Sequence, residues 1–521
     1  MPVRVQIVLE PEAAADMDNI RRSAAKVIKA DPDLPFDVRI VKRSVDARQR
    51  RIKVLLTVDL FTHNEIPQQI IRPFEPENVS GAREVLIAGA GPAGLFAALR
   101  LIELGIKPVI FERGRVVSHR KRDIARISRE HIVDPDSNYC FGEGGAGTFS
   151  DGKLYTRSKK RGDNFRALEL LCHFGADKSI LYEAHPHLGT DKLPGIISSV
   201  RKAILDAGGE IFFERRINNI LTENKTVKGV LFAGNEKYLC NNLILATGHS
   251  ARDVYDICRS AGITLVMKPF AMGVRVEHPQ VLIDKIRYHG NERGKYLPAA
   301  SYNIVRQVDG RGVYSFCMCP GGYIVPSATS SEEVVVNGMS PSGRSSPFAN
   351  SGIVVEIKPE DLAKYQRYGE LAGIMYQKDM EKDAWINGGR SQRAPAQRLA
   401  DFVNGTFSSS LPSVSYFPGV TSSPLHEWLP PVLYGRLKEG FRLFGSAMKG
   451  WLTNEAVILG VESRTSSPVR IPRDPQTMEN IDITGLYPCG EGSGYAGGII
   501  SSAVDGMRTA EAVAAGISCR V

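Results

Sequence analysis

The chain has 521 residues, of which 43% are hydrophobic and 24% charged, as in ordinary globular proteins. This length is too great for one hydrophobic core and predicts two or three domains. The net charge of +9 is modest, the eight scattered cysteines exclude a disulfide framework, and no cysteine–histidine cluster has zinc spacing, so we expect no metal.

The sequence favours a cytoplasmic protein with no membrane span. No apolar run approaches the roughly 18 residues that a membrane helix needs. The first residues, MPVRVQIVLEPEAA, alternate like a strand and lack both the basic start and the apolar stretch of a secretory signal.

Residues 1–75 predict a small N-terminal α+β module. Residues 3–9 alternate as a strand, residues 11–30 have helical spacing, and strand-like runs cover 36–45 and 52–61. Nucleic acid is one partner for the basic residues of this hairpin. The module is nearly neutral and lacks an aromatic stacking pattern, so a strand edge protected by charge is favoured. The basic residues are Lys42, Arg43, Arg48, Arg50, Arg51 and Lys53.

The strongest motif of the chain begins after residue 84. Gly89, Gly91 and Gly94 form G-x-G-x-x-G between the apolar strand VLIAG and an amphipathic helix. The first glycine permits a tight turn, the second lets the backbone approach a pyrophosphate, and the third lets helix and strand pack closely. Glu112 ends the next strand, where a carboxylate accepts hydrogen bonds from ribose hydroxyls. The pattern predicts a dinucleotide site.

Two later segments indicate that this dinucleotide is FAD. Residues 246–248, Ala-Thr-Gly, end another apolar strand, and Gly490 and Glu491 precede a helix that begins near Gly498. A helix N-terminus at this place stabilises the anionic reduced flavin. Rossmann enzymes that bind only NAD lack such a late turn.

A glycine-rich loop at residues 142–152 is expected to press its backbone against the flavin or its diphosphate. A flexible surface loop is the alternative. Arg113 and the basic helix at 120–129 can help to neutralise the diphosphate, although a solvated face explains the distal arginines of that helix better.

These motifs predict an FAD-binding domain built from residues 83–265 and 480–521, interrupted by a substrate or cap insert at 266–479. The predicted cofactor-binding residues are Gly89, Gly91, Pro92, Ala93, Gly94, Glu112, Arg113, Gly145, Gly147, Thr148, Ser150, Gly152, Ile217, Ala246, Thr247, Gly248, Gly490, Glu491, Gly497, Gly498 and Ile499.

The segments FGEGGAGTFSDGKL, LATGHSARDVYDI, KPFAMGVRVEHP, FCMCPGG and CGEGSGYAGGI together carry a family resemblance over nearly the whole chain. The sequence resembles the bacterial FAD-dependent proteins labelled NAD(FAD)-utilising dehydrogenases, within the glutathione-reductase-type FAD superfamily. More distantly it is similar to geranylgeranyl-reductase-like and aminoacetone-oxidase-like flavoproteins. The resemblance implies an α/β fold with a Rossmann-like FAD-binding domain of glutathione-reductase type, a mixed α+β insert and a small N-terminal α+β module.

No second G-x-G-x-x-G and no CxxC redox pair occurs between residues 266 and 480. If NADH or NADPH reduces the flavin, we expect it to bind transiently, without a domain of its own. Otherwise the organic substrate supplies the hydride.

Four residues are candidates for catalysis, each with a plainer alternative. Cys317 and Cys319 invite a redox role, but an i, i+2 disulfide is strained, and two packed thiols are favoured. His249 follows the Ala-Thr-Gly turn and is more often a structural histidine. Arg464 can clamp a carboxylate substrate or lie on the surface.

The sequence therefore predicts an FAD-dependent oxidoreductase, a dehydrogenase that transfers hydride between a small organic substrate and flavin. An FAD-dependent RNA-modifying enzyme and a non-catalytic structural flavoprotein are the two alternatives.

Overall fold

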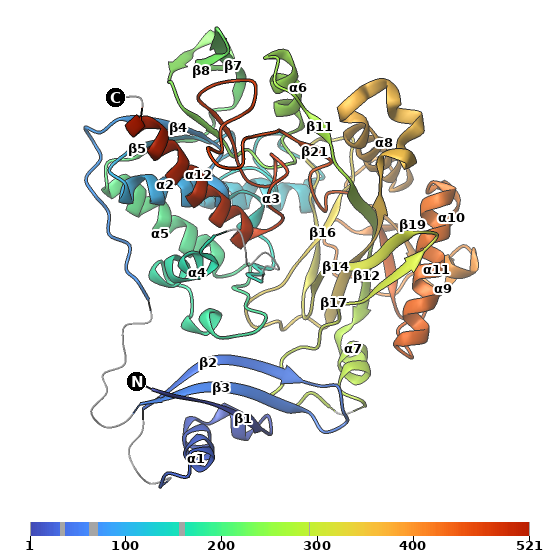
Figure 1. Cartoon of the computed structure of the whole chain (residues 1–521). Helices are drawn as coiled ribbons and strands as arrows, with labels where there is room; N and C mark the ends of the chain where they lie inside the picture. Colours follow the sequence, from blue (N-terminus) through green and yellow to red (C-terminus); the bar gives the residue numbers. More distant parts are fainter. Residues whose placement is uncertain (1, 32–36, 62–70, 156–161, 291, 520–521) are drawn as a thin grey trace.

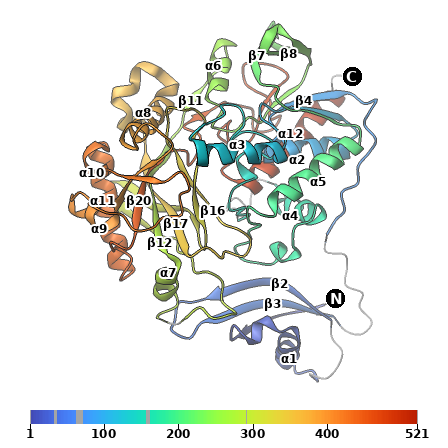
Figure 2. The same ribbon diagram turned by 180° about the vertical axis from the view of Figure 1, so that it is seen from behind.

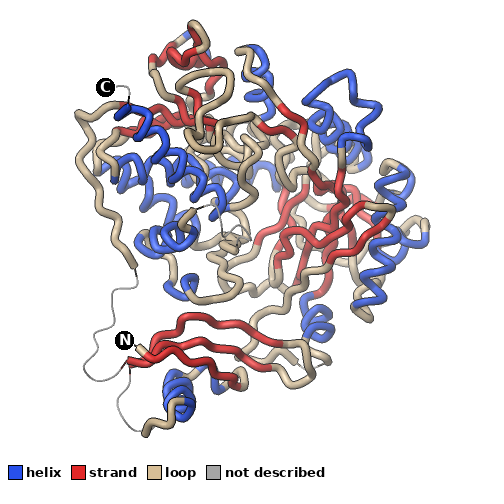
Figure 3. Tube along the Cα trace, viewed as in Figure 1, coloured by secondary structure: helices blue, strands red, loops and turns tan. Residues whose placement is uncertain are grey.

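The computed structural model describes residues 2–31, 37–61, 71–155, 162–290 and 292–519 (Figure 1). Its strands form two large sheets, with a third sheet from the N-terminal residues beneath them (Figures 1 and 3). Among the described residues, no helix combines the length and apolar character needed to cross a membrane. The same residues contain no group of three metal-binding side chains that could hold an ion.

The N-terminal residues form an antiparallel sheet with the order β1-β3-β2, and helix α1 packs against it. This helix is shorter than the predicted 11–30, because Asp16 caps it by accepting a hydrogen bond from the Asp18 amide. Arg43 of β2 exchanges backbone hydrogen bonds with Tyr182 and Ala184, which joins the module to the rest of the chain. The elements are β1 (Val3–Leu9), η1 (Ala13–Ala15), α1 (Met17–Val27), β2 (Asp37–Asp46) and β3 (Lys53–Phe61).

A parallel five-stranded sheet with the order β22-β10-β4-β5-β6 holds the dinucleotide motif. Strand β22 comes from the C-terminal part of the chain and pairs with β10, so residues separated by about half the sequence share one sheet. The glycine motif follows β4, the central strand. The strands are β4 (Glu84–Ala88), β5 (Lys107–Phe111), β6 (Glu210–Phe212), β10 (Leu243–Leu245) and β22 (Leu486–Pro488).

Helices and a small antiparallel sheet cover the two faces of these parallel strands. A core that includes Leu99, Val200 and Ala510 packs one face, where α2 and α12 lie side by side (Figures 1 and 2). Strands β7, β8 and β9 and helix α6 pack the other. These elements are α2 (Pro92–Glu103), α3 (Val117–Glu130), α4 (Asn164–His173), α5 (Leu193–Asp206), β7 (Ile217–Glu223), β8 (Thr226–Phe232), β9 (Lys237–Leu239), α6 (Arg252–Ser260) and α12 (Ile499–Cys519).

The second large sheet has seven strands in the order β13-β14-β17-β12-β20-β18-β19 and is antiparallel except for the β18–β19 pair. Its core includes Phe402, Phe441 and Trp451. The strands are β12 (Phe270–Pro279), β13 (Val305–Val308), β14 (Arg311–Cys319), β17 (Phe348–Ile357), β18 (Ala394–Arg398), β19 (Val420–Ser422) and β20 (Val457–Glu462). The helices around them are α7 (Gln280–Arg287), α8 (Ala372–Asn387), α9 (Leu399–Asn404), α10 (Leu425–Trp428) and α11 (Pro431–Ala447).

Two short strand pairs lie outside the large sheets. Strand β11 pairs with β21, and β15 pairs with β16. These strands are β11 (Val266–Met267), β15 (Tyr323–Pro326), β16 (Val336–Met339) and β21 (Val469–Arg470). The remaining short helical turns are η2 (Gly145–Gly147), η3 (Lys178–Leu181), η4 (Ala233–Asn235) and η5 (Pro359–Leu371).

Candidate functional site

The glycine turn after β4 passes closely against the end of β10. Gly89 has φ +102°, and a Cβ there would lie 2.6 Å from the carbonyl oxygen of Ala246. A Cβ at Gly94 would overlap the carbonyl oxygen of Gly89, so helix α2 can start this close only with glycine at that position. Gly91 is the N-cap of α2, and Pro92 occupies its first turn.

Glu112, at the end of β5, holds three backbone segments together. Its buried carboxylate accepts hydrogen bonds from the amides of Ala90 at 2.8 Å, Gly114 at 2.9 Å and Gly142 at 2.9 Å. The sequence predicted only a contact with ribose for this residue. The structure adds a bracing role, because one carboxylate links the glycine turn to the glycine-rich loop.

Arg120 of α3 is fully buried and supports the glycine-rich loop. Its guanidinium donates to the carbonyl oxygens of Asn138 at 2.7 Å and of Tyr139 and Glu143 at 2.8 Å. Burial lowers the pKa of Arg120 to about 10. The sequence predicted that the arginines of this helix face either a diphosphate or solvent. The burial of Arg120 could have been predicted from its position, since it follows Val117 by three residues and therefore lies on the apolar face of the helix.

A cavity of about 390 Å³ runs from the glycine turn to the second sheet. The positions where Gly91, Gly248, Gly497 and Gly498 would carry a Cβ are open, with no protein atom closer than 3.9 Å. Backbone that is bare on the side of a cavity suits a bulky cofactor that lies against it. The predicted residues in its wall are Gly89, Gly91, Pro92, Ala93, Glu112, Arg113, Gly145, Gly147, Ser150, Gly152, Ile217, Ala246, Thr247, Gly248, His249, Cys317, Arg464, Glu491, Gly497, Gly498 and Ile499.

Four predicted site residues lie outside this wall. Gly94 packs beneath the turn, and Thr148 is buried with its hydroxyl donating to the carbonyl oxygen of Glu143. The Gly490 amide donates to Asp505 at 2.8 Å, which fixes the late turn to α12. Cys319 is fully buried behind the wall.

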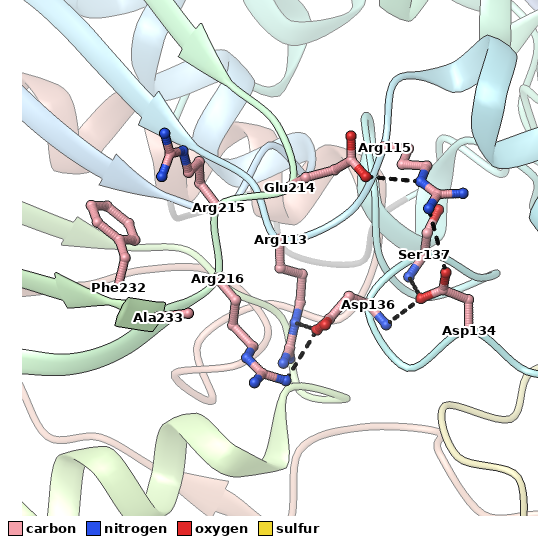
Figure 4. A pocket seen from close by; sticks show the side chains of 10 residues that line it. All are labelled: Arg113, Arg115, Asp134, Asp136, Ser137, Glu214, Arg215, Arg216, Phe232 and Ala233. Atoms are coloured by element: carbon pink, nitrogen blue, oxygen red, sulfur yellow. Dashed lines mark hydrogen bonds and ion pairs between the residues drawn. The ribbon is translucent and has the colours of Figure 1, made fainter. Parts of the chain in front are cut away.

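Arg113 does not present a free charge to the cavity. Its guanidinium donates to Asp136 at 3.0 Å and to Asp253 at 2.8 Å, so two carboxylates balance it. This pairing opposes the predicted neutralisation of a diphosphate by Arg113. Figure 4 shows the adjoining charged cavity of about 290 Å³, where Arg216 reaches the same Asp136 and Arg115 pairs with Glu214.

Arg464 lines the cavity, but its guanidinium is already bonded to other side chains. It donates to Glu333 at 2.7 Å, to Glu381 at 2.9 and 3.1 Å and to Thr329 at 2.9 Å. This arrangement opposes the predicted clamp on a carboxylate substrate, because the guanidinium is already bound to two carboxylates and a hydroxyl group. Arg252 binds the same Glu381 at 2.7 Å, which makes the cluster a buried anchor for the cavity wall.

His249 and Glu491 form a half-buried pair in the wall. The His249 ring nitrogen Nε2 lies 3.1 Å from the carbonyl oxygen of Arg464, and Nδ1 lies 3.6 Å from Glu491. Burial and the nearby Arg464 lower the pKa of His249 to about 4, so the ring is neutral at pH 7. Burial raises the pKa of Glu491 to about 7, against the opposing charge of Lys268. Glu491 can therefore hold or release a proton near neutral pH.

Three of the six basic residues of the N-terminal hairpin lie close to acids. Arg48 contacts Asp46 at 2.6 Å, and Arg51 contacts Glu10 at 2.6 Å. Arg43 lies 3.7 Å from Glu183. These pairs reduce the charge available to a nucleic acid backbone.

Two comparisons by sequence relate the chain to known families. Residues 269–465 match the family described as FAD-dependent protein, C-terminal domain-like, and residues 1–61 match a domain of unknown function, DUF8436. A protein of Clostridium beijerinckii that bears the name "Uncharacterized protein" is 38% identical over 516 residues, covering 95% of this chain and 96% of that one.

Several solved structures of flavin enzymes are similar at low identity. A single-residue variant of the E. coli quinol fumarate reductase FrdA has a TM-score of 0.38 at 13% identity, covering 84% of this chain and 70% of that one. The flavin-dependent brominase Bmp2 has a TM-score of 0.36 at 13% identity, covering 84% and 80%. A geranylgeranyl bacteriochlorophyll reductase-like protein of Thermoplasma acidophilum has 0.34 at 14% identity, also covering 84% and 80%.

The clostridial relative matches over nearly the whole chain, and the family that residues 269–465 match is described as FAD-dependent. The chain belongs to the same family as this clostridial protein, a family of FAD-dependent flavoproteins.

Proposed function

We propose that the protein is an FAD-dependent oxidoreductase that moves a hydride between flavin and a small organic substrate. The observation that carries this proposal is the single cavity that joins the dinucleotide turn at Gly91 to Cys317 of the second sheet. Such a cavity offers one end to a cofactor and the other to a substrate. We assign the FAD-binding domain of glutathione-reductase type to residues 83–265 and 480–521, with residues 266–479 as the cap.

FAD bound in this cavity supplies the hydride chemistry. The bare backbone at Gly91, Gly248 and Gly497 gives it room, and Glu112 keeps the glycine turn and the glycine-rich loop in register. Helix α12 begins at Ile499 in the cavity wall, so its positive end favours negative charge there. Glu491 holds a proton at the same wall.

The proposal is tested first by the visible spectrum of the purified protein, followed by heat release of the chromophore. We expect flavin bands and released FAD. Anaerobic addition of NADH and NADPH then asks whether a nicotinamide, bound transiently, bleaches the bands. A protein that stays colourless after reconstitution with FAD contradicts the proposal. Bound FAD that neither nicotinamides nor a panel of small organic substrates reduce indicates a structural flavoprotein.

A variant ties the flavin to this cavity. Gly91 has φ −77°, which any residue adopts, and its Cβ position faces open space. Gly91→Val should therefore fold normally and lose FAD, because its methyl groups enter the cavity. Gly81→Val is the matched control, since Gly81 is exposed, lies outside the cavity and has nothing within 4 Å of its Cβ position. Equal FAD content in the two variants would place the flavin elsewhere.

A further inference from the structure

One lysine contacts both sulfur atoms of the C-x-C segment at the cavity wall. The Lys153 ammonium lies 3.6 Å from Sγ of Cys317 and 3.5 Å from Sγ of Cys319. Lys153 follows the glycine-rich loop and lines the cavity with Cys317, whereas Cys319 is fully buried. The two thiols therefore differ in access while they share one cation.

The backbone at this point departs from a regular strand. The pairing of β14 with β17 shifts between Phe316 and Cys319, and Cys317 has φ +46°. A left-handed conformation at a residue other than glycine is strained, and such strain gathers at functional sites. A bulge also re-aims side chains, here at the edge of a cavity.

Charged groups around the two sulfurs stabilise negative charge on Cys317. The Cys319 thiol donates to the backbone carbonyl oxygen of Cys317 at 3.3 Å. The neighbouring Cys319 side chain and the positive charges of Lys153 and Arg275 hold the pKa of Cys317 well below its ordinary value. Burial raises the pKa of Cys319, and its bond to Cys317 adds to this effect. Asp151 lies 3.0 Å from Lys153 and opposes the shift at Cys317.

Of the other charged groups near this cluster, Arg344 and Arg275 are paired with acids, and, besides burial, the nearby Cys317 contributes to the raised pKa of Glu491. Arg344 lies 3.8 Å from Asp151, and Arg275 donates to Glu462 at 2.7 Å. The Arg275 guanidinium also donates to the carbonyl oxygen of Cys317, within the bulge, at 3.4 Å. Cys317, in the cavity wall, therefore loses its proton more readily than an ordinary cysteine, whereas Cys319 keeps its proton.

We propose that Cys317 and Cys319 form a reversible dithiol–disulfide couple in the wall of the FAD cavity, with Cys317 as the attacking thiolate and Cys319 as its partner. On oxidation the two sulfurs form one bond, the S–H bond of Cys319 breaks, and two electrons and one proton pass to oxidised flavin, giving anionic reduced flavin. The reverse reaction restores thiolate and thiol. A disulfide between residues i and i+2 is strained, which makes it easily reduced and suits a redox couple better than a structural bridge.

This inference rests on the proposed function, because FAD is the two-electron partner. The test treats the purified full-length protein with the thiol oxidant diamide, blocks free thiols with N-ethylmaleimide and analyses tryptic peptides by mass spectrometry. Cleavage after Arg311 and Arg344 yields one peptide, 312–344, that contains Cys317 and Cys319 and no other cysteine. We expect this peptide to lose two hydrogens, to resist alkylation and to recover both thiols after dithiothreitol.

A second measurement follows the rate at which iodoacetamide alkylates Cys317 as a function of pH. Lys153→Met should slow this reaction about tenfold at pH values below the pKa of Cys317, as a one-unit rise in that pKa would do. Lys202→Met is the matched control, because Lys202 is exposed and its one ion pair within the described part of the chain is with Asp206. Cys140 is the internal reference thiol, because it also lines the cavity but donates to the carbonyl oxygen of Ser327.

The outcomes separate the two proposals. FAD-loaded protein in which diamide forms no crosslink, or in which Cys317 reacts like Cys140 regardless of Lys153, overturns the dithiol couple alone. Protein that never binds FAD overturns the proposed function, whatever the thiols do. A long-wavelength charge-transfer band in the FAD-loaded protein that disappears in Cys317→Ser and persists in Cys319→Ser supports Cys317 as the thiolate beside the flavin.

Discussion

The carboxylate of Glu112 accepts a hydrogen bond from the backbone amide of Ala90 at 2.8 Å, which fastens the end of β5 to the glycine turn after β4. The same carboxylate also accepts from Gly142 at 2.9 Å, so the glycine-rich loop is held in the same way. The two glycine segments of the cavity wall are therefore coupled through one buried side chain.

Glu112→Gln should weaken FAD binding and stability together. The amide of glutamine places a donor against backbone amides that are themselves donors, and at least one of the three bonds is lost. We expect the free energy of unfolding in urea to fall by about 2–3 kcal/mol, the range for a bond to a charged group plus an unsatisfied donor. Glu214→Gln, which breaks only the exposed pair with Arg115, should cost less than about 1 kcal/mol. Equal losses in the two variants would show that Glu112 does not brace the wall.

Arg120→Lys should be more disruptive than its conservative appearance suggests. Three carbonyl oxygens receive the guanidinium, and an ammonium on a shorter side chain cannot reach all of them. We expect a loss of about 3 kcal/mol of stability and partial loss of FAD, measured by denaturation and by flavin absorbance. Arg126→Lys, on the exposed face of α3 where Arg126 pairs with Glu130, should behave like the natural protein. Retained FAD and stability in Arg120→Lys would contradict this role.

Glu491→Gln should change how stability depends on pH. The folded pKa of Glu491, about 7, is above the ordinary value near 4.3, so between these values the native state binds more protons than the unfolded state. Stability without FAD should therefore fall as pH rises through this window. The variant should be more stable than the natural protein above pH 7, by up to about 3 kcal/mol.

Glu277 complicates this titration in a predictable way. Burial raises its pKa to about 7 as well, so it contributes a slope of the same sign. In Glu491→Gln the slope should be reduced without disappearing. Urea unfolding at several pH values measures it, with Glu427→Gln as the exposed control. A slope that Glu491→Gln leaves unchanged would show that Glu491 titrates normally.

Local patterns predicted the parts of this structure that depend on neighbours in sequence. The mixed α/β class with a parallel sheet is confirmed, and the G-x-G-x-x-G turn lies between a strand and a helix as its spacing requires. The FAD-dependent family is confirmed by the matches. The domain limits and the roles of the individual site residues stay predictions.

Contacts between side chains that are far apart in the sequence could not be predicted from it. Lys153 lies 164 positions before Cys317, and Arg464 lies 83 positions after Glu381. The local sequence does not predict either contact, because the same polar residue can stand in a loop whether its side chain is solvated or bonded to a buried partner. For this reason the sequence offered Arg464 either a carboxylate substrate or the surface, whereas the structure places it in a buried cluster with Glu333 and Glu381.

Glu381→Gln should be the most damaging of the four substitutions. Glu381 is fully buried and binds Arg252 and Arg464, whose charges lower its pKa well below the ordinary value. A depressed carboxyl pKa contributes stability that is complete above about pH 4.3 and is lost as pH falls towards the folded value. Removing the carboxylate leaves two buried guanidinium groups short of a partner, and we expect a loss of about 3–5 kcal/mol at pH 7.

Urea unfolding at pH 7 and pH 4 checks this expectation. The difference between the natural protein and Glu381→Gln should shrink at the lower pH, since the carboxylate of the unfolded chain begins to take up a proton there while the folded one stays charged. Asp256→Asn, which breaks an exposed pair with Arg259, is the control and should cost less than about 1 kcal/mol. A loss at pH 7 no larger than that of Asp256→Asn would mean that Glu333 alone balances the two arginines, and that Glu381 does not anchor this wall of the cavity.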